Sequence, residues 1–143
     1  MENRLTKSKG WTQERMEEMK YFLDTYAMLE IIKGNPKYSK YMPKEFYTSI
    51  FQLYELYYIL LRDFDEKTAK RFYQVFSQYK IRIEEKDIFQ GSELKLKLRK
   101  REVSYVDVAG YVIAKRIGAR FLTGDKEFKD LENVEYTKWQ TKY

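Results

Sequence analysis

The sequence of 143 residues contains no cysteine and no histidine. Without cysteine the chain can form no disulfide, no thiol nucleophile and no thiolate zinc site. Without histidine it has no imidazole base, which excludes serine–histidine catalysis and histidine-ligated metals. Any catalysis by this chain must therefore use carboxylates, lysine, tyrosine, hydroxyl groups or a metal ion bound through oxygen.

Long apolar runs are also missing. The most hydrophobic segment, YELYYILL at residues 54–61, carries Glu55 and is far shorter than the roughly 18 residues that can span a bilayer. The polar N-terminal segment has no apolar core of the kind found in a secretory signal. We therefore predict a cytoplasmic protein with no membrane partner.

The composition indicates a folded protein with a basic surface. Hydrophobic residues make up 43% of the chain and aromatic residues 17%, enough to build a core within one domain. The formal net charge of +6 favours binding to nucleic acid through phosphate neutralisation. The same charge could equally give only a basic, soluble surface.

The first 18 residues differ from the rest of the chain because they are polar and charged throughout. We assign residues 1–18 to an N-terminal extension of unknown role and residues 19–143 to the folded domain. The extension could be helical, a flexible arm, foreign sequence, or the result of a start upstream of Met16 or Met19. The sequence does not decide among these alternatives.

Short apolar runs alternate with helical patterns through the rest of the chain. The segment LKLKLRK at 94–100 alternates with period two, but the length and flanks of residues 86–101 favour a helix. Alternating strands and helices predict an α/β fold with a parallel sheet covered on both faces. We expect strands at 21–23, 46–50, 80–83, 119–123 and 134–137, and helices at 26–33, from 50 to about 62, from 65 to 79, at 86–101, 104–117 and 126–131.

Three aspartates lie where predicted helices begin. Asp24 follows the first strand directly, and Asp125 follows the strand at 119–123. Each could simply cap the next helix. Ser104 and Asp107 have the spacing of a capping box, which also places an acid at a helix N-terminus. Because parallel strands end at one edge of the sheet, we expect these acids to share that edge.

Glu55 lies in a segment that is apolar on nearly every side. A helix that is hydrophobic all round is buried, so we predict that Glu55 is buried as well. An unpaired buried carboxylate is unfavourable. A bound cation would remove this penalty, and so would a salt bridge to lysine or arginine.

Taken together, three aspartates and one glutamate provide hard oxygen ligands in a chain without histidine or cysteine. Such ligands suit Mg²⁺ or Mn²⁺. A metal ion held by carboxylates on a basic protein indicates metal-assisted hydrolysis of phosphodiester bonds.

Several segments together resemble the PIN domain, and among PIN domains the VapC-type toxin ribonucleases. The resemblance covers roughly residues 19 to 140, and the longer N-terminus departs from the family pattern. The segments are KYFLDTYAMLEII at 20–32, the helix with Glu55, SYVDVAGYVIAKRIGARFLTGDKEF at 104–128 and LENVEY at 131–136.

This resemblance implies a Rossmann-like α/β/α sandwich with a central parallel sheet of four to five strands. It also implies that four acids converge on one or two Mg²⁺ or Mn²⁺ ions: Asp24, Glu55, Asp107 and Asp125. Asp24 and Asp107 would be the principal ligands. Thr123 would support the site by positioning water or phosphate, and Asp130 could supply a further acid.

The function that the resemblance implies is a Mg²⁺- or Mn²⁺-dependent endoribonuclease acting on single-stranded or structured RNA. It would be the toxin of a VapBC-like pair, a homodimer neutralised by a small antitoxin protein. The alternative is a catalytically weak PIN-like module that binds nucleic acid or protein. The basic run LKLKLRKR at 94–101 could contact phosphates or form a solvated helix face, and we assign no RNA-binding residue.

Overall fold

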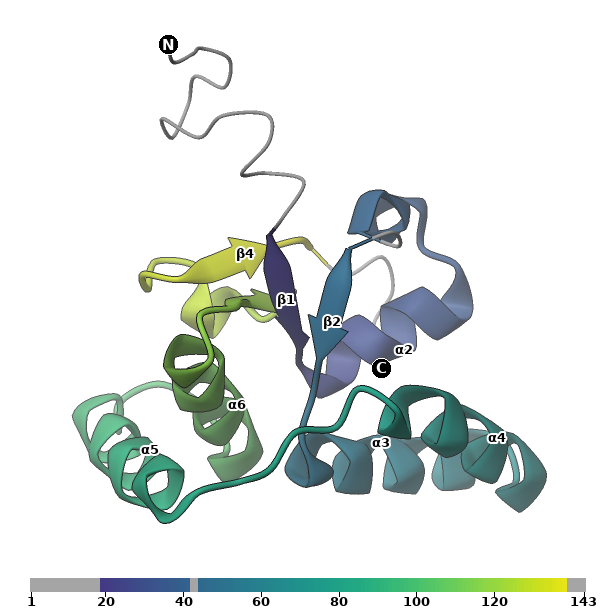
Figure 1. Ribbon diagram of the computed structural model, residues 1–143, viewed down its shortest axis with the longest axis horizontal. Coiled ribbons are helices and arrows are strands. Elements are labelled where there is room, and N and C mark those ends of the chain that lie inside the picture. Colours follow the sequence, from purple (N-terminus) through teal and green to yellow (C-terminus); the bar gives the residue numbers. More distant parts are fainter. Residues whose placement is uncertain (1–18, 42–43, 139–143) are drawn as a thin grey trace, which may run out of the picture.

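The computed structural model describes residues 19–41 and 44–138, so the predicted extension at 1–18 lies outside the described residues. The centre of the fold is a parallel sheet of four strands in the order β2-β1-β3-β4 (Figure 1). The parallel sheet predicted from the sequence is confirmed. The strands are β1 (Lys20–Leu23), β2 (Glu45–Tyr47), β3 (Arg120–Thr123) and β4 (Val134–Tyr136).

The central strands β1 and β3 end side by side. Leu23 is paired with Leu122, and the Asp24 N–H donates to the Leu122 carbonyl at 3.3 Å. The strand predicted at 80–83 is wrong, because in this segment only Lys80 is paired, through an isolated bridge to Thr48 just beyond the end of β2. The pairing of β1 with β3 brings segments that are distant in the sequence together at the carboxyl edge of the sheet.

The described residues form five α-helices and two short 3₁₀ helices. The helix predicted at 86–101 despite its alternating sequence is confirmed, whereas the one predicted at 126–131 is only a 3₁₀ turn. The helices are α2 (Thr25–Lys33), η1 (Pro36–Tyr41), α3 (Ile50–Asp63), α4 (Glu66–Ser77), α5 (Glu85–Lys97), α6 (Tyr105–Arg116) and η2 (Lys126–Phe128).

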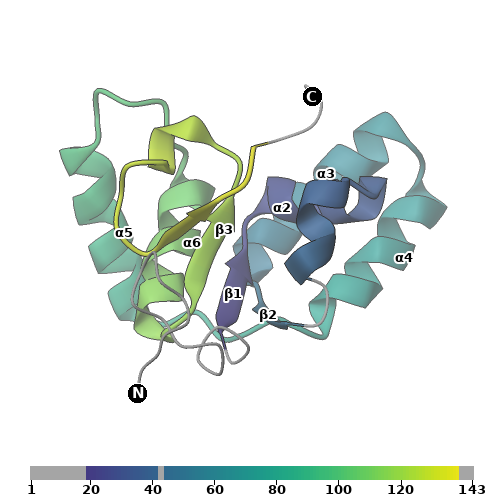
Figure 2. The same cartoon turned by 90° about the horizontal axis from the view of Figure 1, so that it is seen from above.

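Helices cover both faces of the sheet. The alternation of side chains along β1 sends Tyr21 and Leu23 into one core and Phe22 into the other. The first core includes residues of α2, α3 and α4, and the second includes residues of α6. Figure 2 shows α5 and α6 on one side of the sheet and α2, α3 and α4 on the other. This arrangement is the predicted α/β/α sandwich.

Gly110 allows α6 to approach both the sheet and α3. A Cβ atom at this position would lie 2.6 Å from Nε2 of Gln52 and 2.9 Å from a ring carbon of Phe121. The Gln52 amide donates to the Val106 carbonyl at 2.9 Å. The glycine and the amide together hold the first turns of α3 and α6 against each other.

Among residues 19–41 and 44–138, no helix combines the length and apolar character that crossing a membrane requires.

Candidate active site

Asp24 begins α2 and is almost completely buried, with 5% of its surface exposed. Its Oδ1 accepts a hydrogen bond from the Ala27 N–H at 2.6 Å, which confirms that it caps the helix. Its Oδ2 accepts a hydrogen bond from the hydroxyl of Thr123 on the neighbouring strand. The cap therefore uses only one of the two carboxylate oxygens.

The buried hydroxyl of Thr123 connects two strand ends. It donates to Asp24 Oδ2 and accepts the backbone N–H of Asp125 at 3.0 Å. Asp24 and Thr123 are 99 positions apart in the chain. The two strand-to-helix junctions of β1 and β3 are thus held together by one side chain.

Asp107 and Asp125 also begin helices, as predicted. Asp107 accepts the Ser104 N–H at 3.0 Å and Ser104 Oγ accepts the Asp107 N–H at 3.0 Å, which is the expected capping box. Asp125 caps η2 by accepting the Glu127 N–H at 2.9 Å. Both aspartates are half-buried.

The prediction that Glu55 is buried is wrong, since its side chain is half-buried. Helix α3 packs one face against α2, α4 and α6 and leaves the other open, with Tyr54 77% exposed and Tyr58 58% exposed. The sequence pattern failed because tyrosine counts as apolar although its hydroxyl tolerates water. No lysine or arginine among the described residues forms an ion pair with Glu55 or with the three aspartates.

Two of the four acids, Asp24 and Asp107, have raised pKa values. Burial, together with the negative charges of Asp107 and Asp125, raises the pKa of Asp24 to about 8. Burial also raises the pKa of Asp107 to about 6, with added contributions from Asp125 and Glu55. Each of the four predicted acids is therefore near enough to another to interact electrostatically.

Tyr26 is a neighbour of these acids that sequence reasoning missed. Burial raises the pKa of its hydroxyl, and the charges of Glu55, Asp107 and Asp24 act in the same direction. Its position in the first turn of α2, two residues after Asp24, was the available signal.

The predicted further acid, Asp130, is engaged elsewhere. Its two oxygens accept hydrogen bonds from the Arg101 guanidinium at 2.9 and 3.0 Å. Arg101 also belongs to the predicted basic run, so this cation is partly neutralised.

The chemistry of the four acids fits a divalent cation, although their geometry does not form a closed cage. In the part of the chain that the structure describes, no three acids lie close enough together to hold a metal ion. Electrostatic repulsion acts over longer distances than coordination, which reconciles this spacing with the raised pKa values. Oxygen donors without a basic partner, one of them deeply buried, would be stabilised by a hard cation.

Comparison with known proteins gives one family. The PIN domain family matches residues 21–134. No curated protein matches the chain.

Solved structures of VapBC and VapC proteins resemble the chain. VapBC2 from Rickettsia felis, bound to a DNA fragment from its promoter, is 21% identical with a TM-score of 0.67, covering 85% of this chain and 99% of that chain. VapBC-1 from nontypeable Haemophilus influenzae is 17% identical with a TM-score of 0.66, covering 86% and 100%. VapC20 from Mycobacterium tuberculosis, a toxin that cleaves the sarcin-ricin loop, is 18% identical with a TM-score of 0.65, covering 82% and 98%. At these identities the likeness establishes a common fold.

Proposed function

Because the chain belongs to the PIN domain family, we propose that it is a Mg²⁺- or Mn²⁺-dependent endoribonuclease that hydrolyses RNA phosphodiester bonds. The observation that carries the proposal is the group of interacting acids without a basic partner. Two of them, Asp24 and Asp107, have raised pKa values in a protein whose net charge is +6. Such a group is unfavourable without a cation and becomes favourable with one.

Asp24 and Asp107 are the principal metal ligands in this proposal, and Glu55 and Asp125 complete the set directly or through water. A bound divalent cation lowers the pKa of water and stabilises negative charge on phosphate oxygens. The Thr123 hydroxyl fixes the orientation of Asp24 Oδ2, and the Ala27 N–H fixes Oδ1. The capping box holds Asp107 in the same way.

We assign the toxin role of a VapBC-like pair, with a small antitoxin protein as partner and a homodimer as the assembled form. The similar structures from Rickettsia felis and Haemophilus influenzae are VapBC proteins. The exposed aromatic side chains of α3 offer a surface for a protein contact. A cytoplasmic location belongs to the same proposal.

The decisive experiment measures cleavage of single-stranded RNA by the purified protein with Mg²⁺, with Mn²⁺ and with excess EDTA. We expect cleavage only with metal. Asp24→Asn and Asp107→Asn should each lower the rate by at least about 100-fold, because each removes a charged ligand. Asp65→Asn is a matched control, since Asp65 caps α4 through the Thr68 N–H outside the acid group.

Cleavage in EDTA, or unchanged rates in both variants of the acid group, would show that the proposal is wrong. The alternative function, a catalytically weak binding module, predicts a different pattern. RNA would then bind more tightly with metal while no RNA is cut under any condition.

A further inference from the structure

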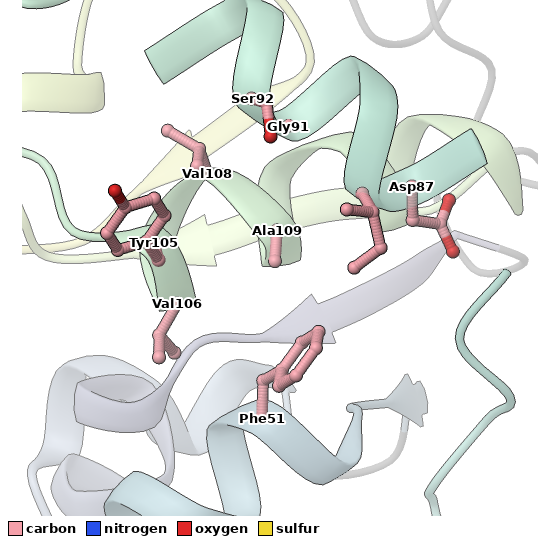
Figure 3. A pocket seen from close by; sticks show the side chains of 9 residues that line it. Phe51, Asp87, Gly91, Ser92, Tyr105, Val106, Val108 and Ala109 are labelled. Atoms are coloured by element: carbon pink, nitrogen blue, oxygen red, sulfur yellow. The ribbon is translucent and has the colours of Figure 1, made fainter. Parts of the chain in front are cut away.

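A cavity of about 220 Å³ lies between α3, α5 and α6 (Figure 3). Its walls are mainly apolar and include Phe51 from α3, Ile88 and Gly91 from α5, and Tyr105, Val106 and Ala109 from α6. Gly91 has no side chain to extend into the cavity. A methyl group at this position would fit without a clash, since its nearest neighbours, Val112 and Ala109, would lie 3.8–3.9 Å away.

The cavity shares two helices with the acid group. Phe51 precedes Glu55 by one turn of α3, so the two side chains point in similar directions. Tyr105 and Val106 directly precede Asp107 in the first turn of α6. Since the Gln52 amide ties these two helix starts together through the Val106 carbonyl, the cavity and the acids have a fixed relation.

The size and walls of the cavity suit a flat aromatic group. An apolar cavity of roughly 150 Å³ is enough to bind benzene, so about 220 Å³ has room for a nucleobase. Phe51 supplies an aromatic wall, and Ser92 supplies a hydroxyl at the same cavity. Figure 3 shows Phe51 and Ala109 pointing toward each other across the space.

The exposed ring of Tyr105 and the ammonium group of Lys95 lie at the edge of the cavity. The Tyr105 side chain is 74% exposed, so its ring is accessible to a ligand. The Lys95 ammonium lies 4.8 Å from the centre of this ring and donates to the Val103 carbonyl at 2.9 Å. Proteins that bind single-stranded nucleic acid combine these features, stacking bases on aromatic rings and placing cations along the backbone.

We propose that this cavity binds one unpaired nucleobase of the RNA strand next to the phosphate that is cleaved, with Tyr105 stacking on the strand and Lys95 contacting its backbone. The inference rests on the proposed function and adds a binding site for one base of the strand. A base can enter the cavity only when it is unstacked and unpaired, so single strands and loops can fill this site and regular duplexes cannot.

Binding without cleavage tests the cavity directly. The probe is a short single-stranded oligoribonucleotide containing the fluorescent base 2-aminopurine, titrated with protein in EDTA. We expect the emission to change on binding to the wild-type protein, and Tyr105→Ala to weaken binding by roughly 10-fold, as the loss of one base stack does elsewhere. Tyr105→Phe keeps the ring and should bind like the wild type.

Two further variants make the test specific. Gly91→Leu should fill the cavity and weaken binding, whereas Phe89→Ala removes an exposed ring of α5 outside the cavity and should have no effect. Because Tyr105 is mostly exposed, its truncation leaves the fold intact even where Gly91→Leu does not. The same oligonucleotide in a duplex should give no comparable signal.

The outcome separates this inference from the proposed function. If Tyr105→Ala and the wild type bind the probe equally, the cavity is not a base site, although loss of cleavage in Asp24→Asn would still support the nuclease. If no RNA is cleaved but binding depends on the Tyr105 ring, the base site stands and the nuclease proposal fails. Mapping of cleavage sites completes the test, since Tyr105→Ala should weaken any base preference beside the cut.

Discussion

At the scale of single residues, Asp24 has two functions that do not compete. One oxygen caps α2 through Ala27, and the other faces Thr123 at the end of β3. A capping aspartate normally lies at the surface, where it remains charged. The burial of Asp24 instead favours its protonated form, so its charge depends on what occupies the neighbouring space.

The stability of the metal-free protein should fall as the pH rises from about pH 5 to about pH 8. The pKa of Asp24 is raised to about 8 and that of Asp107 to about 6, so the folded state binds more protons than the unfolded state in this range. The contribution of these acids is complete below the unfolded pKa near 4 and is lost as the pH passes the folded values. Chemical unfolding in EDTA across this range measures the slope.

Asp24→Asn should flatten this dependence, because the amide keeps the cap and cannot ionise. One carboxyl contributes at most about 1.4 kcal/mol per pH unit to the slope. Asp65→Asn, at an exposed cap, provides the comparison. Identical slopes in the wild type and Asp24→Asn would contradict the raised pKa of Asp24.

Thr123→Val should destabilise the protein by about 1–3 kcal/mol, because the substitution keeps the shape but removes a buried hydroxyl. Asp24 Oδ2 loses its donor and the Asp125 N–H loses its acceptor. Loss of the donor should also raise the pKa of Asp24 further, since this hydrogen bond favours the charged form. Thermal unfolding measures the effect, and Thr123→Ser, which keeps the hydroxyl, should restore most of the stability.

At the scale of helices and strands, the same substitution should have opposite effects in α5 and α6. Gly91→Ala should stabilise the protein by about 0.5–1 kcal/mol, since alanine favours helix and the new methyl group meets only ordinary contacts. Gly110→Ala should destabilise it by about 1–3 kcal/mol, because the methyl group would overlap Gln52 and Phe121. Urea unfolding measures the change in the free energy of unfolding for both variants. Changes of the same sign in the two variants would contradict the packing described for α6.

The element positions could be predicted where local chemistry determines them. Asp24, Ser104 and Asp125 mark helix starts because capping depends on a few neighbouring residues, and each cap is observed. The helix at α5 was recognisable from its length, despite the alternation of LKLKLRK at 94–100.

Features that depend on packing could not be predicted. The exposure of Glu55 depends on which face of α3 meets the neighbouring helices, and an almost wholly apolar pattern does not encode that choice. The segment at 80–83 joins the sheet at Lys80 alone, since pairing depends on a partner strand distant in sequence. The cavity beside Gly91 arises from the spacing of three helices, which no local pattern records.

At the scale of the whole molecule, the described part of the sandwich leaves an aromatic stripe uncovered on α3. The exposed residues follow α3 at helical spacing and continue just beyond it. They are Tyr54, Tyr58, Leu61 and Phe64, each between 44% and 77% exposed. A stripe of this kind is typical of a protein interface, which supports the proposed homodimer.

The double variant Tyr54→Glu/Tyr58→Glu should convert a dimer into a monomer, because charged residues are unfavourable in the centre of an interface. Sedimentation velocity at several protein concentrations measures the change. Phe89→Glu alters an exposed aromatic residue of α5 away from the stripe and should leave the assembly unchanged. If the wild-type protein sediments as a monomer at all concentrations, the proposed homodimer is wrong.

The order of strands in the sheet also has a consequence for the protein during its synthesis. The central strand β1 is made early, but its partner β3 begins only at Arg120, and the Thr123 hydroxyl that holds Asp24 comes from the end of that strand. A ribosome must therefore translate the chain beyond Asp125 before the four acids can come together. In the proposed nuclease, a chain that stops before Thr123 would lack Asp125 and the hydroxyl that holds Asp24, so it should not cleave RNA.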